Sequence, residues 1–432
     1  MDEPLMIPDA TSSLDIWLTY LTNQHNKIID MSIDRVASVA KKLNLLNPAK
    51  KVVTVAGTNG KGTTCHVLEL ILIEAGLKVG VYSSPHLLYY TERVRINGKI
   101  LPEKEFCNVF DDIESKRGII TLTYFEYTTL AALQLFKKAK LDVVILEVGL
   151  GGRLDATNVV NADISVITTI ALDHIDYLGS NLEKIAYEKA GIFRSGRYAI
   201  VGEENVLRSI NNVAKTVGAK LFLRGVDWKF KLQNNNWNWR SNDHYFKQLP
   251  LPNVPLDNAA TALAVIDCLI KDSNAIIQRI EQKDIYNGLI KSKLPGRFQI
   301  ICKQPYVILD VAHNCHAASY LAKRVSRLPK KKNTKVYGVV AMLADKDIKN
   351  TLSCLVPHID KWYLASISGT RGADSGQLAQ YVDSPYQFDT VKNAWSQVII
   401  EAKKHDIILV YGSFHVVSEI MKLQKKEEIL IV

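Results

Sequence analysis

A glycine-rich turn with one lysine is the part of the chain whose residue types point most directly to chemistry. The turn consists of Gly57, Thr58, Asn59, Gly60, Lys61, Gly62 and Thr63. It follows a β-branched run and precedes an amphipathic segment, which is the strand–loop–helix order of a phosphate-binding loop. Backbone N–H groups, a helix N-terminus and Lys61 could together hold phosphate oxygens. We predict a nucleotide site here, although the Gly-x-x-Gly-Lys-Gly-Thr spacing is tighter than the common pattern.

Three further polar residues each follow an apolar run that is typical of a buried strand: Ser84, Glu147 and His174. Ligands of parallel sheets bind beyond the carboxyl ends of the strands. A buried carboxylate such as Glu147 is costly unless it meets a cation, and Mg²⁺ binds one or two carboxylates together with phosphates. These residues are therefore candidate metal ligands. A capped turn at Ser84 and a hydrogen-bonded core histidine at His174 are the structural alternatives.

Residues farther along the chain could complete a nucleotide site. Asp310 follows the apolar run 306–309 and could accept hydrogen bonds from ribose hydroxyls. Arg297 lies in the candidate linker 294–297 and could reach phosphates. Lys189 lies in a helical segment that ends near Gly191, and its pattern alone favours a surface lysine.

Alternating strand-like and helical segments must position these residues, and they predict parallel α/β sheets. In the first half we expect strands at 52–56, 79–82, 142–147 and 164–170 and helices at 63–75, 103–115 and 126–139. We expect antiparallel hairpins over 217–247, a helix from 258 and strands at 306–310, 335–340 and 407–411. The fold class predicted is α/β, with a mostly parallel P-loop-type ATPase domain (1–296) followed by a smaller Rossmann-like α/β domain (297–432).

Composition narrows the class of protein. The chain has 432 residues, a net charge of +10 and 47% hydrophobic residues, which indicates a globular protein of more than one domain. The six cysteines form no C-x-x-C pair, and neither a signal peptide nor an apolar run of about 20 residues is evident, so we expect a cytoplasmic protein. The positive charge suits polyanions or simply solubility, and no aromatic-interleaved basic motif suggests nucleic acid.

Seven motifs, taken in order, resemble one family over about residues 10 to 425. They are the loop 57–63, Tyr-Ser-Ser-Pro-His at 82–86, Glu-Val-Gly-Leu-Gly-Gly-Arg-Leu-Asp at 147–155, Asp-His at 173–174, Glu-Lys-Ala-Gly at 188–191, Leu-Pro-Gly-Arg at 294–297 and Asp-Val-Ala-His-Asn at 310–314. Together they closely resemble folylpolyglutamate synthase, often combined with dihydrofolate synthase, of the Mur ligase superfamily.

The resemblance implies an ATP-dependent amide ligase in folate metabolism. ATP would phosphorylate a carboxylate to an acyl phosphate, which the amine of L-glutamate would attack. The acceptors would be dihydropteroate and the γ-carboxylate of a tetrahydrofolate glutamate. We expect both activities, with a single activity as the alternative. The partners would be these small molecules, with no nucleic acid and no membrane, and we expect a monomer.

The resemblance also implies roles for individual residues. Lys61, Lys189 and His174 would be catalytic, and two Mg²⁺ ions would be held by Ser84, Glu147, His174 and a carbamylated Lys189. ATP would contact Gly57, Thr58, Asn59, Gly60, Lys61, Gly62, Thr63, Asn258, Arg297 and Asp310. The pterin site would contain Ile28, Ile29, Asp30, Met31, Thr123, Tyr124, Phe125, Glu126, Leu154, Asp155 and Ala156. The identity of any general base stays open.

One departure and two alternatives accompany this interpretation. The family commonly has proline after the His-Asn of the last motif, and Cys315 stands there instead, so the geometry of the turn near Asp310 is not predicted.

A cell-wall Mur enzyme would need an extra N-terminal domain, and we expect the ~50 residues before the loop to be too few for one. A P-loop regulatory NTPase or nucleic-acid-binding module is the alternative from another class, and a salt-dependent shift with DNA would favour it.

Overall fold

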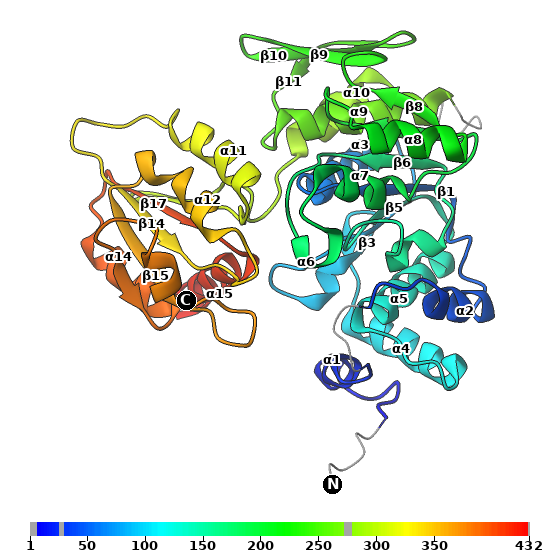
Figure 1. The fold of residues 1–432 in the computed structure, drawn as a ribbon, viewed down its shortest axis with the longest axis horizontal. Helices are drawn as coiled ribbons and strands as arrows, with labels where there is room; N and C mark the ends of the chain where they lie inside the picture. Colours follow the sequence, from blue (N-terminus) through cyan, green and yellow to red (C-terminus); the bar gives the residue numbers. More distant parts are fainter. Residues whose placement is uncertain (1–6, 26–29, 272–278, 431–432) are drawn as a thin grey trace. The chain divides into compact units, whose positions relative to one another are not determined.

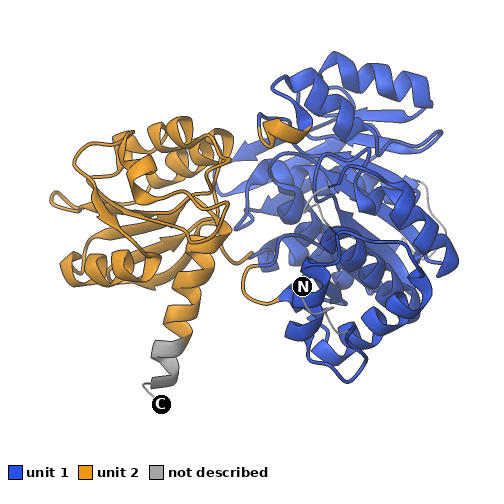
Figure 2. Ribbon diagram, turned by 60° about the horizontal axis from the view of Figure 1, so that its bottom comes forward, with its two compact units in different colours: residues 1–86, 90–172, 178–293 blue, residues 87–89, 173–177, 294–432 orange. Residues whose placement is uncertain are grey.

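The chain folds into two compact units in a computed structural model, which describes residues 7–25, 30–271 and 279–430 (Figure 1). Unit 1 contains residues 1–86, 90–172 and 178–293 (Figure 2, blue). Unit 2 contains residues 87–89, 173–177 and 294–432 (Figure 2, orange). Most of unit 2 is therefore one continuous stretch of chain that begins at Leu294, and two short segments from the first half group with it.

The elements of unit 1 alternate between helices and strands over most of its length. Its helices are α1 (Leu14–Thr22), α2 (Asp34–Lys42), α3 (Lys61–Glu74), α4 (Glu103–Arg117), α5 (Tyr124–Ala139), α7 (Leu182–Ala190), α8 (Arg208–Val217), α9 (Leu256–Lys271) and α10 (Gln282–Lys291), with 3₁₀ turns η1 (Tyr90–Arg93) and η2 (Ala156–Val159). Its strands are β1 (Ala49–Ala56), β2 (Val79–Tyr82), β3 (Val94–Ile96), β4 (Lys99–Ile100), β5 (Leu141–Glu147), β6 (Ile164–Ile167), β7 (Tyr198–Val201), β8 (Lys220–Leu223), β9 (Trp228–Gln233), β10 (Asn236–Ser241) and β11 (Tyr245–Pro250). The short helix α6 (Ile175–Leu178) lies where the chain passes from unit 2 back into unit 1.

An eight-stranded sheet with the order β4-β3-β2-β5-β1-β6-β7-β8 is the centre of unit 1. Strands β2, β5, β1, β6, β7 and β8 run parallel, and the antiparallel pairings of this sheet are β2–β3 and β3–β4 at one edge. The central strands are apolar on both faces because helices cover both, as expected of a parallel sheet. Helices α3, α9 and α10 pack side by side, while α1, α2, α4 and α5 share another apolar core with β2 and β5 (Figure 1).

Two expectations for unit 1 need correction. Strand β6 ends at Ile167 rather than at residue 170, because the next residues bond to the loop after β1. The segment 217–247 is not all hairpin, because β8 joins the main sheet in parallel with β7. The antiparallel part is the three-stranded sheet β11-β10-β9, which starts at Trp228 and is anchored by the buried side chains of Trp228, Trp237 and Trp239.

Unit 2 is a smaller α/β unit around one six-stranded sheet with the order β12-β13-β17-β14-β15-β16. Its strands are β12 (Gln299–Lys303), β13 (Tyr306–Leu309), β14 (Val336–Val340), β15 (Lys361–Ala365), β16 (Tyr386–Phe388) and β17 (Ile407–Tyr411). Its helices are α11 (Cys315–Val325), α12 (Ile348–Ser353), α13 (Ser375–Ala379), α14 (Val391–Glu401) and α15 (Phe414–Leu430), with the 3₁₀ turn η4 (Val356–His358). Only β12 runs antiparallel to its neighbour in this sheet.

The eight-stranded sheet of unit 1 and the six-stranded sheet of unit 2 are mostly parallel and carry helices, so the predicted α/β class is confirmed. Each face of the unit 2 sheet has its own apolar core, one that contains α11 and another that contains α14 and α15. Across the described ranges, no helix has the length and apolar character that crossing a bilayer would require.

Candidate active site

The candidate residues of unit 1 gather at one edge of its sheet. Strands β2, β5 and β1 are parallel neighbours, so their carboxyl ends meet at the same edge. Ser84 follows β2, Glu147 is the last residue of β5 and the glycine-rich loop follows β1. The topology therefore brings together a hydroxyl, a carboxylate and a phosphate-binding loop that lie far apart in the sequence.

The loop after β1 is fixed by hydroxyl residues that follow the neighbouring strand β6. Asn59 donates its backbone N–H to Thr169 Oγ1 at 3.0 Å, and Thr168 Oγ1 donates to the Asn59 carbonyl at 2.7 Å. Thr58 N–H donates to the Thr169 carbonyl at 2.7 Å. Sequence reasoning missed these threonines because it continued β6 through them. Two adjacent hydroxyl residues directly after an apolar strand were the available signal.

Two glycines of the loop hold positions that no other residue could occupy without strain. Gly57 has φ 148° and Gly60 has φ 85°, both in the region that favours glycine. A methyl group at Gly57 would overlap the Thr168 hydroxyl, and one at Gly60 would overlap the Asn258 side chain. Asn258 lies at the start of α9 and is mostly buried. The structure therefore places Asn258, a predicted nucleotide contact, directly against the loop.

Gly60→Ala is predicted to weaken nucleotide binding. The left-handed backbone would cost ~1–3 kcal/mol and the clash with Asn258 would add to it, so we expect the Kd for ATP to rise at least about tenfold. Gly76→Ala is the matched control, since Gly76 has a similar φ of 76° but nothing lies within 4 Å of the place that an added methyl group would take. Calorimetric titration with ATP measures the difference. Equal ATP affinity in the two variants would show that Gly60 is not part of a nucleotide site.

Lys61 begins α3 and turns its ammonium back over the loop. Its Nζ donates to the carbonyl of Gly57 at 3.0 Å and to that of Thr58 at 3.3 Å. The first turn of a helix leaves backbone N–H groups without intrahelical partners, and these carry partial positive charge. The loop therefore presents a lysine and a helix N-terminus together, which suits an anion such as a phosphate.

Glu147 and Ser84 lie in contact beside the N-terminus of α3. The Ser84 backbone N–H donates to Glu147 Oε2 at 3.2 Å, and Glu147 is 5% exposed. A methyl group at Gly62 would lie 3.3 Å from Glu147 Oε2, so the carboxylate reaches the first turn of α3. A buried carboxylate beside a hydroxyl and a phosphate loop fits Mg²⁺, which prefers oxygen ligands.

No group of three or more His, Cys, Asp or Glu side chains suited to a metal occurs within the described ranges. Mg²⁺ usually takes one or two protein carboxylates and fills its remaining positions with water and substrate phosphates. The carboxylate of Glu147, beside the start of α3, suits an ion bound in this way.

Lys189 is not the surface lysine that its sequence pattern favours. It lies in the last turn of α7 and is 3% exposed. The end of α7 packs closely on Gly152, since a methyl group there would lie 2.9 Å from the Glu188 carbonyl and 3.0 Å from the Lys189 carbonyl. Arg153 also forms an ion pair with Glu188 at 2.9 Å. Lys189 is thereby fixed against the loop that follows Glu147.

The segments predicted to bind a pterin converge on this same loop. A methyl group at Gly149 would lie 2.5 Å from Phe125 Cζ, and one at Gly151 would lie 3.7 Å from Met31 Cε. Gly149 is two residues beyond Glu147. Phe125 therefore contacts the chain immediately after the candidate metal ligand. Ile28 and Ile29 lie outside the described residues.

Arg35 joins two of the predicted pterin segments and was missed from the sequence. Its Nη1 donates to Asp30 Oδ2 at 3.2 Å, and its Nη2 donates to Glu126 Oε1 at 3.1 Å. The other oxygen of Glu126 accepts the Thr123 N–H at 2.7 Å, while Thr123 Oγ1 accepts the Glu126 N–H at 3.2 Å. This capping box begins α5 just before Tyr124. Arg35 thus connects the Asp30 segment to the start of α5.

Asp155 organises the loop that follows β5. Its Oδ2 accepts the backbone N–H groups of Gly149 at 3.0 Å and Leu150 at 2.9 Å. Its Oδ1 accepts the N–H of Thr157 at 3.0 Å and the hydroxyl of the same residue at 2.6 Å. Burial raises the pKa of Asp155, and these hydrogen bonds oppose that shift. Leu154 and Ala156 flank this carboxylate, so their positions depend on it.

Unit 2 carries its own candidate residues after β13. Asp310 is partly buried and accepts the N–H of Phe298 and that of Ala312, each at 2.8 Å. Burial raises the pKa of Asp310, and the charge of Arg297 opposes that shift. The Arg297 guanidinium lies over the ring of Phe414, 5.8 Å from its centroid. Arg297 and Asp310 therefore lie near each other within one unit.

The turn after Asp310 is held without the proline that the family resemblance led us to expect. Asn314 caps α11, with its side-chain oxygen accepting the Ala317 N–H at 3.0 Å. Cys315 is the first residue of the helix, the position where proline is favoured. The side-chain cap fixes the start of the helix in place of a proline ring.

His174 does not stand at a strand end, because β6 ends seven residues earlier. It has a left-handed backbone with φ 51° and belongs to the short segment that groups with unit 2. Within that unit its Nε2 lies 3.5 Å from Lys346 Nζ. Ser84, Glu147 and Lys189 all belong to unit 1, so the metal-ligand set predicted from the sequence is divided between the two units.

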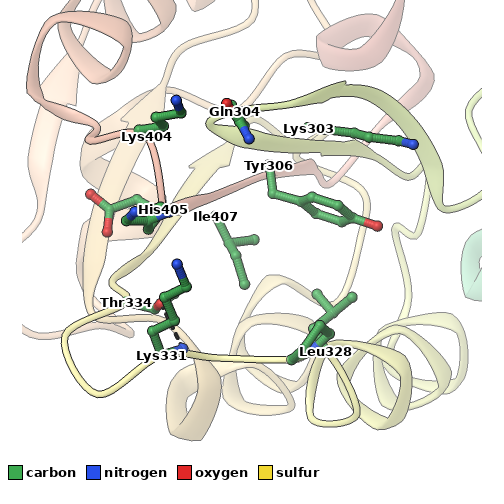
Figure 3. A pocket seen from close by; sticks show the side chains of 11 residues that line it. Lys303, Gln304, Tyr306, Leu328, Lys331, Thr334, Lys404, His405 and Ile407 are labelled. Atoms are coloured by element: carbon green, nitrogen blue, oxygen red, sulfur yellow. Dashed lines mark hydrogen bonds between the residues drawn. The ribbon is translucent and has the colours of Figure 1, made fainter.

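Figure 3 shows a pocket of about 160 Å³ in unit 2. It lies at the end of β13 opposite to Asp310, because Tyr306 at the start of this strand lines it. It is lined by Lys303, Gln304, Tyr306, Leu328, Pro329, Lys331, Thr334, Lys404, His405, Asp406 and Ile407. Tyr306 and Ile407 begin β13 and β17, so the pocket is at the amino ends of these strands. Ligands of parallel sheets bind at the carboxyl ends, and we therefore do not assign the pocket to the nucleotide.

Comparison with known proteins identifies relatives over nearly the whole chain. The Mur ligase middle domain matches residues 55–265, and the Mur ligase glutamate ligase domain matches residues 296–414. The dihydrofolate synthase/folylpolyglutamate synthase of Escherichia coli strain K12 is 52% identical over 416 residues, which is 96% of each chain. Two solved structures are also similar. FolC of E. coli in complex with DHPP and ADP has a TM-score of 0.94 at 51% identity and covers 98% of this chain and 100% of that one. The bifunctional enzyme of Yersinia pestis complexed with AMPPNP and Mn ion has a TM-score of 0.91 at 53% identity, covering 97% of this chain and 100% of that one.

Proposed function

The chain belongs to the dihydrofolate synthase/folylpolyglutamate synthase family of Mur ligases, and we propose on this basis that one site in it serves two acceptors. It is an ATP-dependent ligase that joins L-glutamate to dihydropteroate and to the γ-carboxylate of a tetrahydrofolate glutamate. The main support for a single site that serves both acceptors is the contact of Phe125 with Gly149. This contact joins the predicted pterin segment to the strand end that carries Glu147.

The phosphate loop and Lys61 would hold ATP while the acceptor carboxylate attacks its γ-phosphorus. The products of this step are an acyl phosphate and ADP. Glutamate's amine then attacks the acyl carbon, phosphate leaves and an amide forms. Charge gathers on phosphoryl oxygens in the first step, so fixed donors such as Lys61 and the start of α3 lower its barrier. Gly57 and Gly60 keep the loop backbone close enough to donate hydrogen bonds.

Ser84, Glu147, His174 and a carbamylated Lys189 are the residues that we propose for two Mg²⁺ ions. When bound, Mg²⁺ neutralises phosphate oxygens and orients them for transfer. The burial of Lys189 and the close packing of the end of α7 on Gly152 support its place in this set, because they hold the side chain beside the loop that follows Glu147. The direct contact between Ser84 and Glu147 supports their joint role.

The acceptor would lie along Asp30, Met31 and the 123–126 and 154–156 segments. Phe125, Tyr124 and Met31 offer apolar surface, and a pterin ring stacks well on such side chains. Asn258, Arg297 and Asp310 would contact ATP. We assign the ATP-binding and folate-binding domain to 1–296 and the C-terminal α/β domain to 297–432, and we propose that the protein acts in the cytoplasm as a monomer.

Two acceptor assays test the proposal. Purified protein is incubated with MgATP and radiolabelled L-glutamate, with dihydropteroate in one reaction and tetrahydrofolate in the other. We expect labelled product with both acceptors and none without ATP. Product with a single acceptor would overturn the dual activity, and product with neither would overturn the assignment as a ligase. Binding of DNA with no ATP consumption would instead favour a nucleic-acid module.

Arg35→Ala is predicted to raise the KM for dihydropteroate while leaving the KM for ATP nearly unchanged. The variant removes two hydrogen bonds to carboxylates, worth ~1.5–3 kcal/mol each, so we expect a rise of at least about tenfold. Arg35→Lys should recover only part of this loss, because an ammonium cannot bridge both acids with the geometry of a guanidinium. The exposed Lys41 lies on the same helix, and Lys41→Ala is the control that should change neither constant. Equal rises in both KM values would indicate general loosening of unit 1 instead.

A further inference from the structure

Two cysteine thiols of unit 2 lie in contact although they are 39 residues apart in sequence. Cys315 Sγ and Cys354 Sγ are 3.6 Å apart. Cys315 is the first residue of α11, and Cys354 follows the last residue of α12. The first thiol is exposed and the second is partly buried, and both are free.

The surroundings of Cys354 hold its thiol in place near Cys315. Its Sγ lies 3.2 Å from the Asn350 carbonyl and 3.3 Å from Ser319 Oγ. Cys354 lies on the side of α12 that faces α11, since its Sγ also lies 3.6 Å from the Cys315 carbonyl. The pair is therefore a fixed juxtaposition of an accessible thiol with a sheltered one.

The other cysteines differ from this pair. Cys65, Cys107 and Cys268 are buried, and Cys302 is partly buried on β12. Buried thiols are shielded from reagents and behave as small apolar side chains. Accessibility and a second sulfur in contact are both needed for the formation of an internal disulfide, and Cys315 combines them.

We propose that Cys315 and Cys354 form a reversible modification site, a dithiol that small-molecule disulfides such as oxidised glutathione convert into a Cys315–Cys354 disulfide. The inference is independent of the proposed function, because it concerns the thiols of α11 and α12 and not the reaction with folates.

The chemistry proceeds by two thiol–disulfide exchanges. The Cys315 thiolate attacks one sulfur of the reagent, which forms a mixed disulfide and releases one small thiol. The Cys354 thiolate then attacks Cys315 Sγ and releases the second small thiol. The two protein thiols are oxidised by two electrons, and the reagent disulfide is reduced to two thiols. Exposed Cys315 is the site of entry, and partly buried Cys354 resolves the intermediate.

The reduced state is the resting state of the pair. Partial desolvation by neighbouring atoms, the contact with Cys354 and the charge of Asp347 raise the pKa of the exposed Cys315 thiol. Little thiolate is then present at neutral pH, and the reagents of a reducing compartment would keep both thiols reduced. The disulfide would form when the small-molecule disulfide is in excess. It would tie the start of α11, next to the Asn314 cap and the Asp310 segment, to the end of α12.

The test exposes the whole, folded protein to oxidised glutathione at mildly alkaline pH and then analyses it under denaturing conditions. The thiol titre should fall from six to four per chain, since the chain has six cysteines and two would be consumed. Non-reducing peptide mapping should recover the Cys315 and Cys354 peptides joined, and dithiothreitol should restore six thiols. A titre that stays at six, or a joined pair other than Cys315 and Cys354, would overturn the proposal.

Single variants separate the two steps. Cys354→Ser should stop at the mixed disulfide, visible in the intact mass as one added glutathione on Cys315. Cys315→Ser should give no internal disulfide, and Cys302→Ser should behave as the unmodified chain does. A mixed disulfide that persists on Cys315 in the unmodified chain would also overturn the proposal, because it would show that Cys354 does not reach the intermediate.

Discussion

Lys61→Ala is expected to abolish nearly all ligase turnover, with kcat for either acceptor falling by roughly 10²–10³ or more. The reason is the position of the ammonium, which donates to the Gly57 and Thr58 carbonyls and therefore stands over the loop that would receive the phosphates. When the Lys61 ammonium is removed, the loop and α3 can stabilise charge on the transferred phosphoryl group with backbone N–H groups alone. The measurement is the initial rate of amide formation with saturating substrates.

Stability separates this effect from misfolding. Lys61 is partly exposed and begins its helix, so its truncation should change the free energy of unfolding by less than about 1 kcal/mol. Lys291→Ala is the matched control, because Lys291 forms an ion pair with Glu74 at 2.5 Å at the other end of the same helix. That variant should keep its full rate. Full activity of Lys61→Ala would remove this lysine from the mechanism.

The phosphate loop could be predicted from sequence because its information is local. A β-branched strand, glycines at positions of positive φ and a helix-forming segment follow one another, and the predicted strand 79–82 coincides with β2. Strand ends also carry local information, so Glu147 and Asp310 could be identified as acids that close apolar runs. The mostly parallel α/β class follows from the same alternation.

What could not be predicted depends on pairs of residues that are distant in sequence. Arg35 looks like a solvated charge on an amphipathic helix, and its partner Glu126 is 91 residues away. The end of β6 is likewise set by bonds from Thr168 and Thr169 to Asn59, more than a hundred residues earlier. No periodicity within the strand reports such contacts, which explains why the predicted strand was too long.

The burial of individual side chains is the other property that the local sequence pattern did not predict. Lys189 has the surroundings of a surface lysine in sequence, yet the close approach of α7 to Gly152 places it inside unit 1. Glycine at position 152 permits the close approach of a helix. That this helix is α7 follows from the tertiary structure and not from the local sequence. The antiparallel prediction for 217–247 was wrong only for β8, for a similar reason, since β8 has a short, mixed pattern and its parallel neighbour is β7.

Glu147→Gln is expected to be the second severe loss, and of a different kind from Lys61→Ala. The amide keeps the size of the side chain and can still accept the Ser84 N–H, but it removes the negative charge beside the start of α3. We expect kcat to fall by roughly 10²–10³ and the Mg²⁺ concentration for half-maximal rate to rise at least about tenfold. Initial rates over a series of Mg²⁺ concentrations measure both quantities.

The unfolding transition gives a second, independent expectation for the same variant. Glutamine has the size of glutamate and can still accept the Ser84 N–H, so the melting temperature of the metal-free protein should change little. Glu69→Gln is the control for a structural acid of the same unit. Glu69 is 2% exposed and bonded to Arg95 at 2.8 Å, so its neutralisation should lower the melting temperature without altering the Mg²⁺ requirement. An unchanged Mg²⁺ requirement in Glu147→Gln together with a lowered melting temperature would mean that Glu147, like Glu69, is a structural acid. Comparison of the melting temperature with the Mg²⁺ requirement in these two variants therefore decides whether Glu147, at the end of β5, binds a cation.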